Sequence, residues 1–230
     1  MALLSYSLPS ILLIVATSLH ATNAVEYVVS NTVPNTEGGA IFRDKLGQDY
    51  ARQTMASASE FIWQTLRQPN EADRKPIARV TLVVENFEGI AYTINSSEIH
   101  VSANSYIRNI KGDIKTDFNG VLYHEMTHIW QWDGKRQGHA PNVTEGVADF
   151  VRLRANYAPP TWPPRGSGQF WHEGYAVTAY FLDYCEGLKN GFVADLNMKM
   201  KDGYNDSFFM ELLGKPVDQL WSEYKARYGN

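Results

Sequence analysis

The sequence predicts an α+β domain, in which a small N-terminal sheet with helices precedes a helical C-terminal half. Segments rich in β-branched residues are concentrated between residues 25 and 102. Segments with the apolar period of a helix accompany them and fill the rest of the chain. The chain of 230 residues shows neither internal repeats nor low-complexity tracts. We therefore expect one domain over residues 25–230, with a cleft between its two halves.

The N-terminal half is expected to hold four strands and one long helix. Residues 79–85 are the clearest strand, because β-branched side chains dominate them. Residues 98–102 could be an edge strand above the cleft or an ordinary inner strand, since sequence does not reveal sheet edges. The expected strands are 25–33, 79–85, 90–93 and 98–102, and the expected helix is 44–66.

The pentapeptide 124–128, His-Glu-Met-Thr-His, is the most informative feature of the chain. On a helix, positions i and i+4 lie on one face, so His124 and His128 could bind one metal ion. Glu125 between them could act as a base on water. We expect this helix to have Asp117 as its N-cap and to stop at Asp133-Gly134. The alternative is a buried helix with two hydrogen-bonded histidines.

A third metal ligand is expected from the next helix, because catalytic zinc usually has three protein ligands and a water. Residues 142–153 suit a helix with Asn142 as N-cap, in which Glu145 could simply close a capping box. Alternatively, Glu145 is the third ligand. Asp149, one turn later, would then accept the N–H of a ligand imidazole. We favour this ligand interpretation because it completes the zinc site.

H-E-x-x-H followed by E-x-x-x-D resembles the gluzincin group of zinc peptidases, and the whole chain is similar to the plant basic secretory protein family. The resemblance implies a zincin-like metallopeptidase domain in a secreted, defence-related protein. The net charge of −4 departs from the family name and argues against attraction to acidic walls or membranes. The matching segments are 39–44, 89–93, 98–102, 121–132, 145–149, 181–185 and 212–215.

The resemblance also implies a mechanism in which His124, His128 and Glu145 hold Zn²⁺ and Glu125 takes a proton from water. The developing oxyanion then needs a neutral hydrogen-bond donor. Gluzincin-like enzymes often supply a tyrosine from beyond the glutamate helix, and Tyr175 is our candidate for that role. The alternative for Tyr175 is a tyrosine of the core.

Other polar and aromatic residues receive weaker assignments. Tyr157 and His172 are lesser candidates for the oxyanion role, while His100 and His139 are given none. A stiff proline-rich loop is expected around Trp162. The only cysteine, Cys185, lies in an apolar helical pattern and is expected to be a buried, inert thiol. The expected helices of this half are 175–188, 193–201, 208–213 and 217–228.

Residues 1–24 are expected to be a secretory signal peptide cleaved after Ala24, because their apolar run is too short to span a bilayer. A membrane anchor is the alternative. The sequons at Asn95 and Asn205 lie in polar turns and are candidate glycan sites, and the one at Asn142 is a weaker candidate. No basic run with interleaved aromatics suggests nucleic acid. We expect a monomer in the extracellular space, that is, the apoplast or cell wall.

The leading hypothesis is a secreted zinc-dependent endopeptidase acting on protein or peptide substrates. One alternative is a catalytically weak defence or binding protein that keeps the zincin fold, against which the presence of Glu125 argues. Another is a zinc hydrolase of glycopeptide amides, whose sugars could stack on Trp162, Trp171 and Tyr175.

Overall fold

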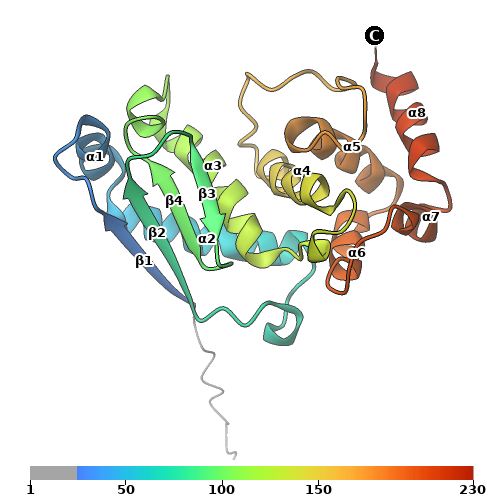
Figure 1. The fold of residues 1–230 in the computed structure, drawn as a ribbon, viewed down its shortest axis with the longest axis horizontal. Helices are drawn as coiled ribbons and strands as arrows, with labels where there is room; N and C mark the ends of the chain where they lie inside the picture. The colour runs from blue at the N-terminus through green and yellow to red at the C-terminus, as the bar shows by residue number, and fades with distance from the viewer. Residues whose placement is uncertain (1–24, 230) are drawn as a thin grey trace, which may run out of the picture.

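The computed structural model describes residues 25–229, which form a four-stranded sheet and eight α-helices (Figure 1). The predicted α+β class is confirmed. The predicted signal peptide, residues 1–24, lies outside the described residues. The N-terminal half holds β1 (Glu26–Asn31), α1 (Glu37–Ile41), α2 (Gln48–Thr65), β2 (Arg79–Glu85), β3 (Ala91–Ile94), β4 (Glu98–Ser102) and α3 (Ile114–Trp130). The C-terminal half holds α4 (Ala140–Arg154), α5 (Tyr175–Leu188), α6 (Phe192–Lys199), α7 (Ser207–Leu213) and α8 (Val217–Tyr228).

The sheet has the strand order β1-β2-β4-β3, with β3 antiparallel to β4 and the other pairs parallel. Along β2, the side chains of Val80, Leu82 and Val84 are buried in alternation, as the period of a strand requires. The possibility that residues 98–102 form an edge strand is wrong, because β4 lies between β2 and β3. The edge strands are β1 and β3, and β3 also contacts α3.

Helices α2 and α3 pack against each other and against the sheet, α2 on β1 and α3 on β3 (Figure 1). The predicted helix over residues 44–66 begins later than expected, at Gln48. Gly47 causes the break, because its φ of +78° lies outside helical geometry and favours glycine. Residues 37–46 instead form the short helix α1 and a single π-helical turn.

Helix α3 begins earlier than predicted and is capped by Asp113 rather than Asp117. The carboxylate of Asp113 accepts the backbone N–H of Lys115 at 3.0 Å and the hydroxyl of Thr116 at 2.7 Å. Asp117 lies inside the first turn and accepts the hydroxyl of Tyr106 instead. The helix ends at Trp130, close to the predicted stop.

The C-terminal half is helical as predicted, and the ends of α5 to α8 lie within two residues of those expected. The rings of Trp171, Phe181, Phe209 and Tyr224 pack together in its interior. Cys185 is fully buried, and burial raises the pKa of its thiol, in line with the expected inert state. Among residues 25–229, no helix combines the length and apolar character needed to cross a membrane.

Close packing of α4 on α5 depends on Gly146. A Cβ at this position would lie 2.6 Å from Cβ of Thr178. Thr178 cannot easily move, because its hydroxyl donates to the carbonyl of Trp171 and accepts the N–H of Gly174, both at 2.8 Å. We expect Gly146→Ala to lower the free energy of unfolding by about 1–3 kcal/mol through overpacking, measured by urea denaturation.

Gly187→Ala is the matched control for this prediction. Gly187 is likewise a helical glycine, in α5, but a Cβ there would meet nothing within 4 Å. This substitution should therefore stabilise the protein by about 0.5 kcal/mol, because alanine favours the helix. Equal stability of the two variants would contradict the packing explanation.

Candidate metal centre

Helix α3 presents the pentapeptide 124–128 to a cleft while it buries its other face in the core. Leu122, Met126 and Ile129 form an apolar stripe of this helix and are fully buried. His124 and Glu125 lie at the border of the core, with 8% and 6% of their surface exposed. Side chains in this position are held by packing and still reach the cleft.

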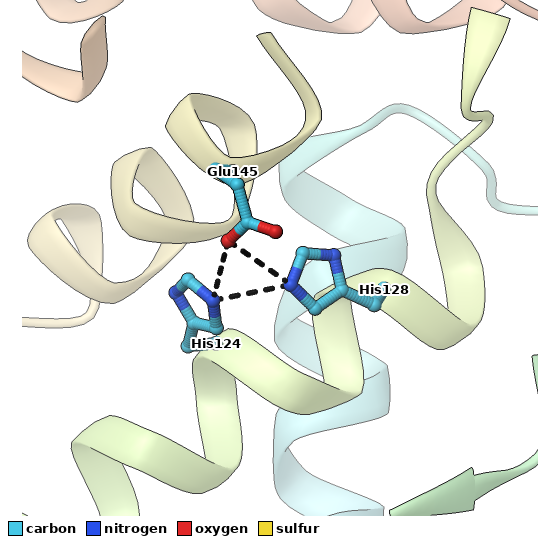
Figure 2. Close-up of side chains that lie close together, drawn as sticks. All are labelled: His124, His128 and Glu145. Carbon is cyan, nitrogen blue, oxygen red and sulfur yellow. Dashed lines mark hydrogen bonds and ion pairs between the residues drawn. The ribbon is translucent and has the colours of Figure 1, made fainter. Parts of the chain in front are cut away.

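Helix α4 brings Glu145 to the same place, although the helix begins differently from the prediction. It starts at Ala140, with Pro141 in the first turn and His139 as N-cap residue, so the predicted N-cap Asn142 is wrong. The Asn142 side chain donates to the carbonyl of His172 instead of capping the helix. The capping box that competed for Glu145 is therefore not formed, and the Glu145 carboxylate points toward α3 (Figure 2).

His124, His128 and Glu145 form a compact triangle of donor atoms (Figure 2). Glu145 Oε2 lies 3.2 Å from His124 Nε2 and 3.6 Å from His128 Nε2, and the two nitrogens are 3.1 Å apart. Three ligands of a tetrahedral zinc ion, at about 2.0–2.1 Å from it, are separated by about 3.3 Å. The triangle therefore fits one such ion without rearrangement, and the donor types, two imidazoles and a carboxylate, are those of catalytic zinc.

Two further side chains orient the histidine rings. Asp149, which is 3% exposed, places Oδ1 2.7 Å from Nδ1 of His124. An N–H at Nδ1 leaves Nε2 free to bind a metal, as expected for the carboxylate partner of a ligand histidine. The amide nitrogen of Gln131 lies 2.7 Å from Nδ1 of His128 and donates to the carbonyl of Thr144 at 3.1 Å. Metal binding through Nε2 of His128 needs a proton on Nδ1, so this amide must then present its oxygen to the ring. Sequence reasoning missed Gln131, although it follows His128 by three residues on the same helix face.

The charged states of His124 and Glu145 stabilise each other. Burial alone would lower the pKa of His124, but hydrogen bonds to Asp149 and Glu145 outweigh it and raise that pKa to about 10. Burial would raise the pKa of Glu145, yet contact with both histidines holds that pKa well below its usual range. Without a metal, His124 is therefore protonated and Glu145 ionised at neutral pH.

Glu125 is held by a residue that the sequence did not single out. Thr93 on β3 donates its hydroxyl to Oε2 of Glu125 at 2.7 Å and also lies 3.2 Å from the Glu125 carbonyl. The contact joins two residues 32 positions apart, so no local pattern could reveal it. It fixes the Glu125 carboxylate at the floor of the cleft.

The triangle lies in an open cleft of about 860 Å³ between the two halves. Residues 90–93 of the β3 segment line one wall, and α4 and the start of α5 line the other. Charged and polar side chains near the triangle also line the cleft. They are Lys75, His128, Gln131, Asp133, Arg136 and Arg152, together with the aromatic side chain of Trp162. Burial lowers the pKa of Lys75 to about 8, an effect that the charge of Asp133 opposes.

Tyr175 lines the cleft at the first position of α5 and is 58% exposed, so the core-tyrosine alternative is wrong. Its ring stacks on that of His124, with centroids 6.0 Å apart. Its φ of +43° is unusual for tyrosine, and such strain is typical of functional positions. Burial and the charges of Glu145, Asp149 and Glu125 raise the pKa of Tyr175, which keeps its hydroxyl a neutral donor.

The weaker candidates lie away from the cleft lining. Tyr157 accepts the side-chain amide of Asn119 at 3.3 Å, and its ring packs on that of Tyr123. His172 stacks on His139, with centroids 3.9 Å apart. Neither contributes to the lining of the cleft in the described chain, and the same holds for His100 and His139. His100 instead lies between Glu85 and Glu98, and His139 contacts Asp206.

Comparison with known proteins identifies the family of the chain. A family model described as a peptidase of plants and bacteria, BSP, matches residues 22–224. The chain belongs to the BSP peptidase family. A curated relative of this BSP chain, a basic secretory protease of Boswellia serrata, is 49% identical over 59 residues, which cover 26% of this chain and 67% of the relative. The resemblance to basic secretory proteins is confirmed. No solved structure shows a significant match to the chain.

Proposed function

We propose that this BSP-family peptidase is a secreted, zinc-dependent endopeptidase with a zincin-like fold and a role in defence. The observation that carries the proposal is the triangle of His124, His128 and Glu145, which lies beside the buried carboxylate of Glu125 in an open cleft. Secretion is supported by the name of the Boswellia relative and by the signal-like residues 1–24.

Glu125 is the proposed general base. His124, His128 and Glu145 would hold the zinc ion, which would supply Lewis acidity toward water and the substrate carbonyl. Glu125 accepts the proton of the attacking water and later donates it to the leaving amine. Thr93 keeps the carboxylate in place through the hydrogen bond to Oε2.

Tyr175 is the proposed donor to the oxyanion that develops on the substrate carbonyl. Its hydroxyl is neutral at physiological pH, its ring lies against that of His124, and it lines the same cleft. A preorganised donor of this kind contributes about 2.7–4 kcal/mol of transition-state stabilisation in well-studied hydrolases.

The edge strand β3 is the proposed binding strand for an extended peptide. The carbonyls of Ile90 and Ile94 accept N–H groups of Ser102 and Ser97, on the β4 side of the hairpin. Because backbone groups alternate in direction along an antiparallel pair, those of Ala91 and Thr93 face away from β4. An extended substrate could pair with these backbone groups whatever its own side chains are, which suits a peptidase.

Asn95 and Asn205 are the proposed glycan sites. Asn95 and Asn205 are exposed in turns, and the Asn205 side chain accepts the N–H of Ser207 at 2.8 Å. Asn142 is less suited, because its side chain is engaged with the carbonyl of His172.

Zinc uptake is expected to release protons. At pH 7.5 the metal-free His124, with its pKa near 10, carries a proton that its Nε2 must lose on binding. Glu145 is already ionised and releases none. We expect about one proton or more per zinc, so zinc affinity should increase with pH up to about 10. Calorimetry in buffers of different ionisation enthalpy measures this, and a buffer-independent heat would contradict it.

A chelation experiment tests the proposed function. The purified protein should cleave denatured casein, lose this activity after treatment with a zinc chelator, and regain it with stoichiometric zinc. Activity that survives complete zinc removal would contradict a zinc-dependent mechanism. Absence of cleavage by the zinc-loaded protein, on casein and on short peptides alike, would contradict the endopeptidase assignment.

A further inference from the structure

We propose that Lys75 forms a subsite of the cleft that binds an acidic side chain of the substrate, and that the peptidase therefore prefers peptides with Glu or Asp near the scissile bond. This inference rests on the proposed function, because it assumes that the cleft binds peptides. Lys75 is the main contact, and neighbouring cations assist it.

Lys75 is a half-buried cation without a counter-ion of its own. Its Nζ donates to the carbonyl of His128 at 3.4 Å, a weak contact. Among residues 25–229, no carboxylate oxygen lies within 4.0 Å of this ammonium group. A half-buried charge loses hydration and gains from any anion that can approach it. Since Lys75 lines the cleft, a bound substrate can supply that anion.

The acidic residue whose charge acts on Lys75 is engaged in other hydrogen bonds. Asp133 also lines the cleft and acts on Lys75 through its charge. However, its carboxylate accepts the backbone N–H of Lys135 at 3.0 Å and caps the short helix that begins there. No oxygen of this carboxylate lies within 4.0 Å of Nζ of Lys75, so Asp133 acts on that charge only at longer range.

Two further cations, Arg136 and Lys201, bear on the charge around Lys75. Arg136 lines the cleft and is exposed. The ring of Trp132 lies 5.7 Å from Nζ of Lys75 and 5.1 Å from Nζ of Lys201. Lys75 and Arg136 thus both line the cleft of a chain whose net charge is −4, whereas Lys201 contacts Trp132 and is not part of the cleft lining. The two lining cations favour an acidic ligand over a neutral or basic one.

The position of Lys75 next to His128 limits where the acidic residue can lie. An extended peptide advances about 3.3 Å per residue, so the contact should fall within about three residues of the scissile bond. Arg152, which also lines the cleft, is a poorer anion site, because its Nε already donates to the carbonyl of Tyr157 at 3.0 Å. We therefore expect the preference on one side of the scissile bond only.

Peptide binding tests this proposal independently of turnover. Labelled octapeptides of Ala, Gly and Leu that carry one Glu or one Gln at each position in turn would be titrated into the zinc-loaded Glu125→Gln variant at pH 7. The Glu peptide should bind about 10-fold tighter than its Gln partner at one or two adjacent positions, as a charge-assisted hydrogen bond allows. In a Glu125→Gln/Lys75→Met variant this ratio should fall to about one.

Lys111→Met in the same background is the matched control, because Lys111 is exposed and does not line the cleft. It should leave the Glu to Gln ratio unchanged, and Lys75→Arg, which keeps a positive charge, should retain most of it. A ratio near one in the parent, or a ratio that persists without Lys75, would overturn the inference. Discrimination in binding without cleavage by the wild type would contradict the proposed function and leave the subsite standing.

Discussion

Replacement of Glu125 by Gln is expected to reduce kcat by about 10²–10⁴-fold, the range that general base catalysis contributes. Glutamine has nearly the shape of glutamate, and its amide oxygen can still accept the Thr93 hydroxyl that now lies 2.7 Å from Oε2. The buried position should therefore remain packed. Because Glu125 is not part of the donor triangle, zinc content should stay near one ion per chain. Peptide hydrolysis and zinc analysis of the same sample measure both effects.

Glu88→Gln is the control for the loss of one carboxylate, since Glu88 is exposed and away from the cleft lining. Its activity should equal that of the wild type. If Glu125→Gln kept full activity with zinc bound, another group would have to accept the proton of the attacking water. Loss of zinc from this variant would instead mean that Glu125 supports the metal centre.

Glu145→Ala is expected to lose most of its zinc on dialysis. The substitution removes one of the three donor atoms, whereas loss of an outer hydrogen-bond partner of a ligand costs about 10–100-fold in metal affinity. We expect a loss larger than that range for Glu145→Ala, and a loss within it for Asp149→Asn. The variant should fold, because Glu145 has no capping role in α4. Competition with a coloured chelator measures both affinities.

The control for Glu145→Ala is Glu88→Ala, which should bind zinc like the wild type. Circular dichroism of the metal-free variants checks that the fold is kept. Undiminished zinc affinity of Glu145→Ala would contradict its role as ligand and would point to Asp149 or another cleft carboxylate. A larger loss in Asp149→Asn than in Glu145→Ala would require the two roles to be exchanged.

Local patterns predicted those features that depend on neighbouring residues. The i, i+4 spacing of His124 and His128 could be interpreted because a helix alone brings the two rings together. Residues 79–85, 175–188 and 217–228 form the elements predicted for them, since their periodicity is long and uninterrupted. The pairing of Glu145 with α3 was predicted from ligand chemistry, because a three-ligand zinc site otherwise lacked a donor.

Features that depend on tertiary structure could not be predicted from local sequence patterns. The edge position of β3 is set by the pairing of β2 with β4 through a parallel crossover, which no local signal specifies. The contact of Thr93 with Glu125 and the approach of Lys75 to His128 join distant segments for the same reason. The start of α4 could have been found, because Pro141 is typical of a first helical turn and was outweighed by the capping pattern at Asn142.

Native mass spectrometry of the purified chain with equimolar zinc tests the central claim most directly, because it counts the zinc ions bound per chain, for which the triangle of His124, His128 and Glu145 is the proposed site. The proposed centre requires a mass increase that corresponds to one zinc ion per chain. A chain that stays metal-free under these conditions would contradict the metal centre and the peptidase mechanism built on it.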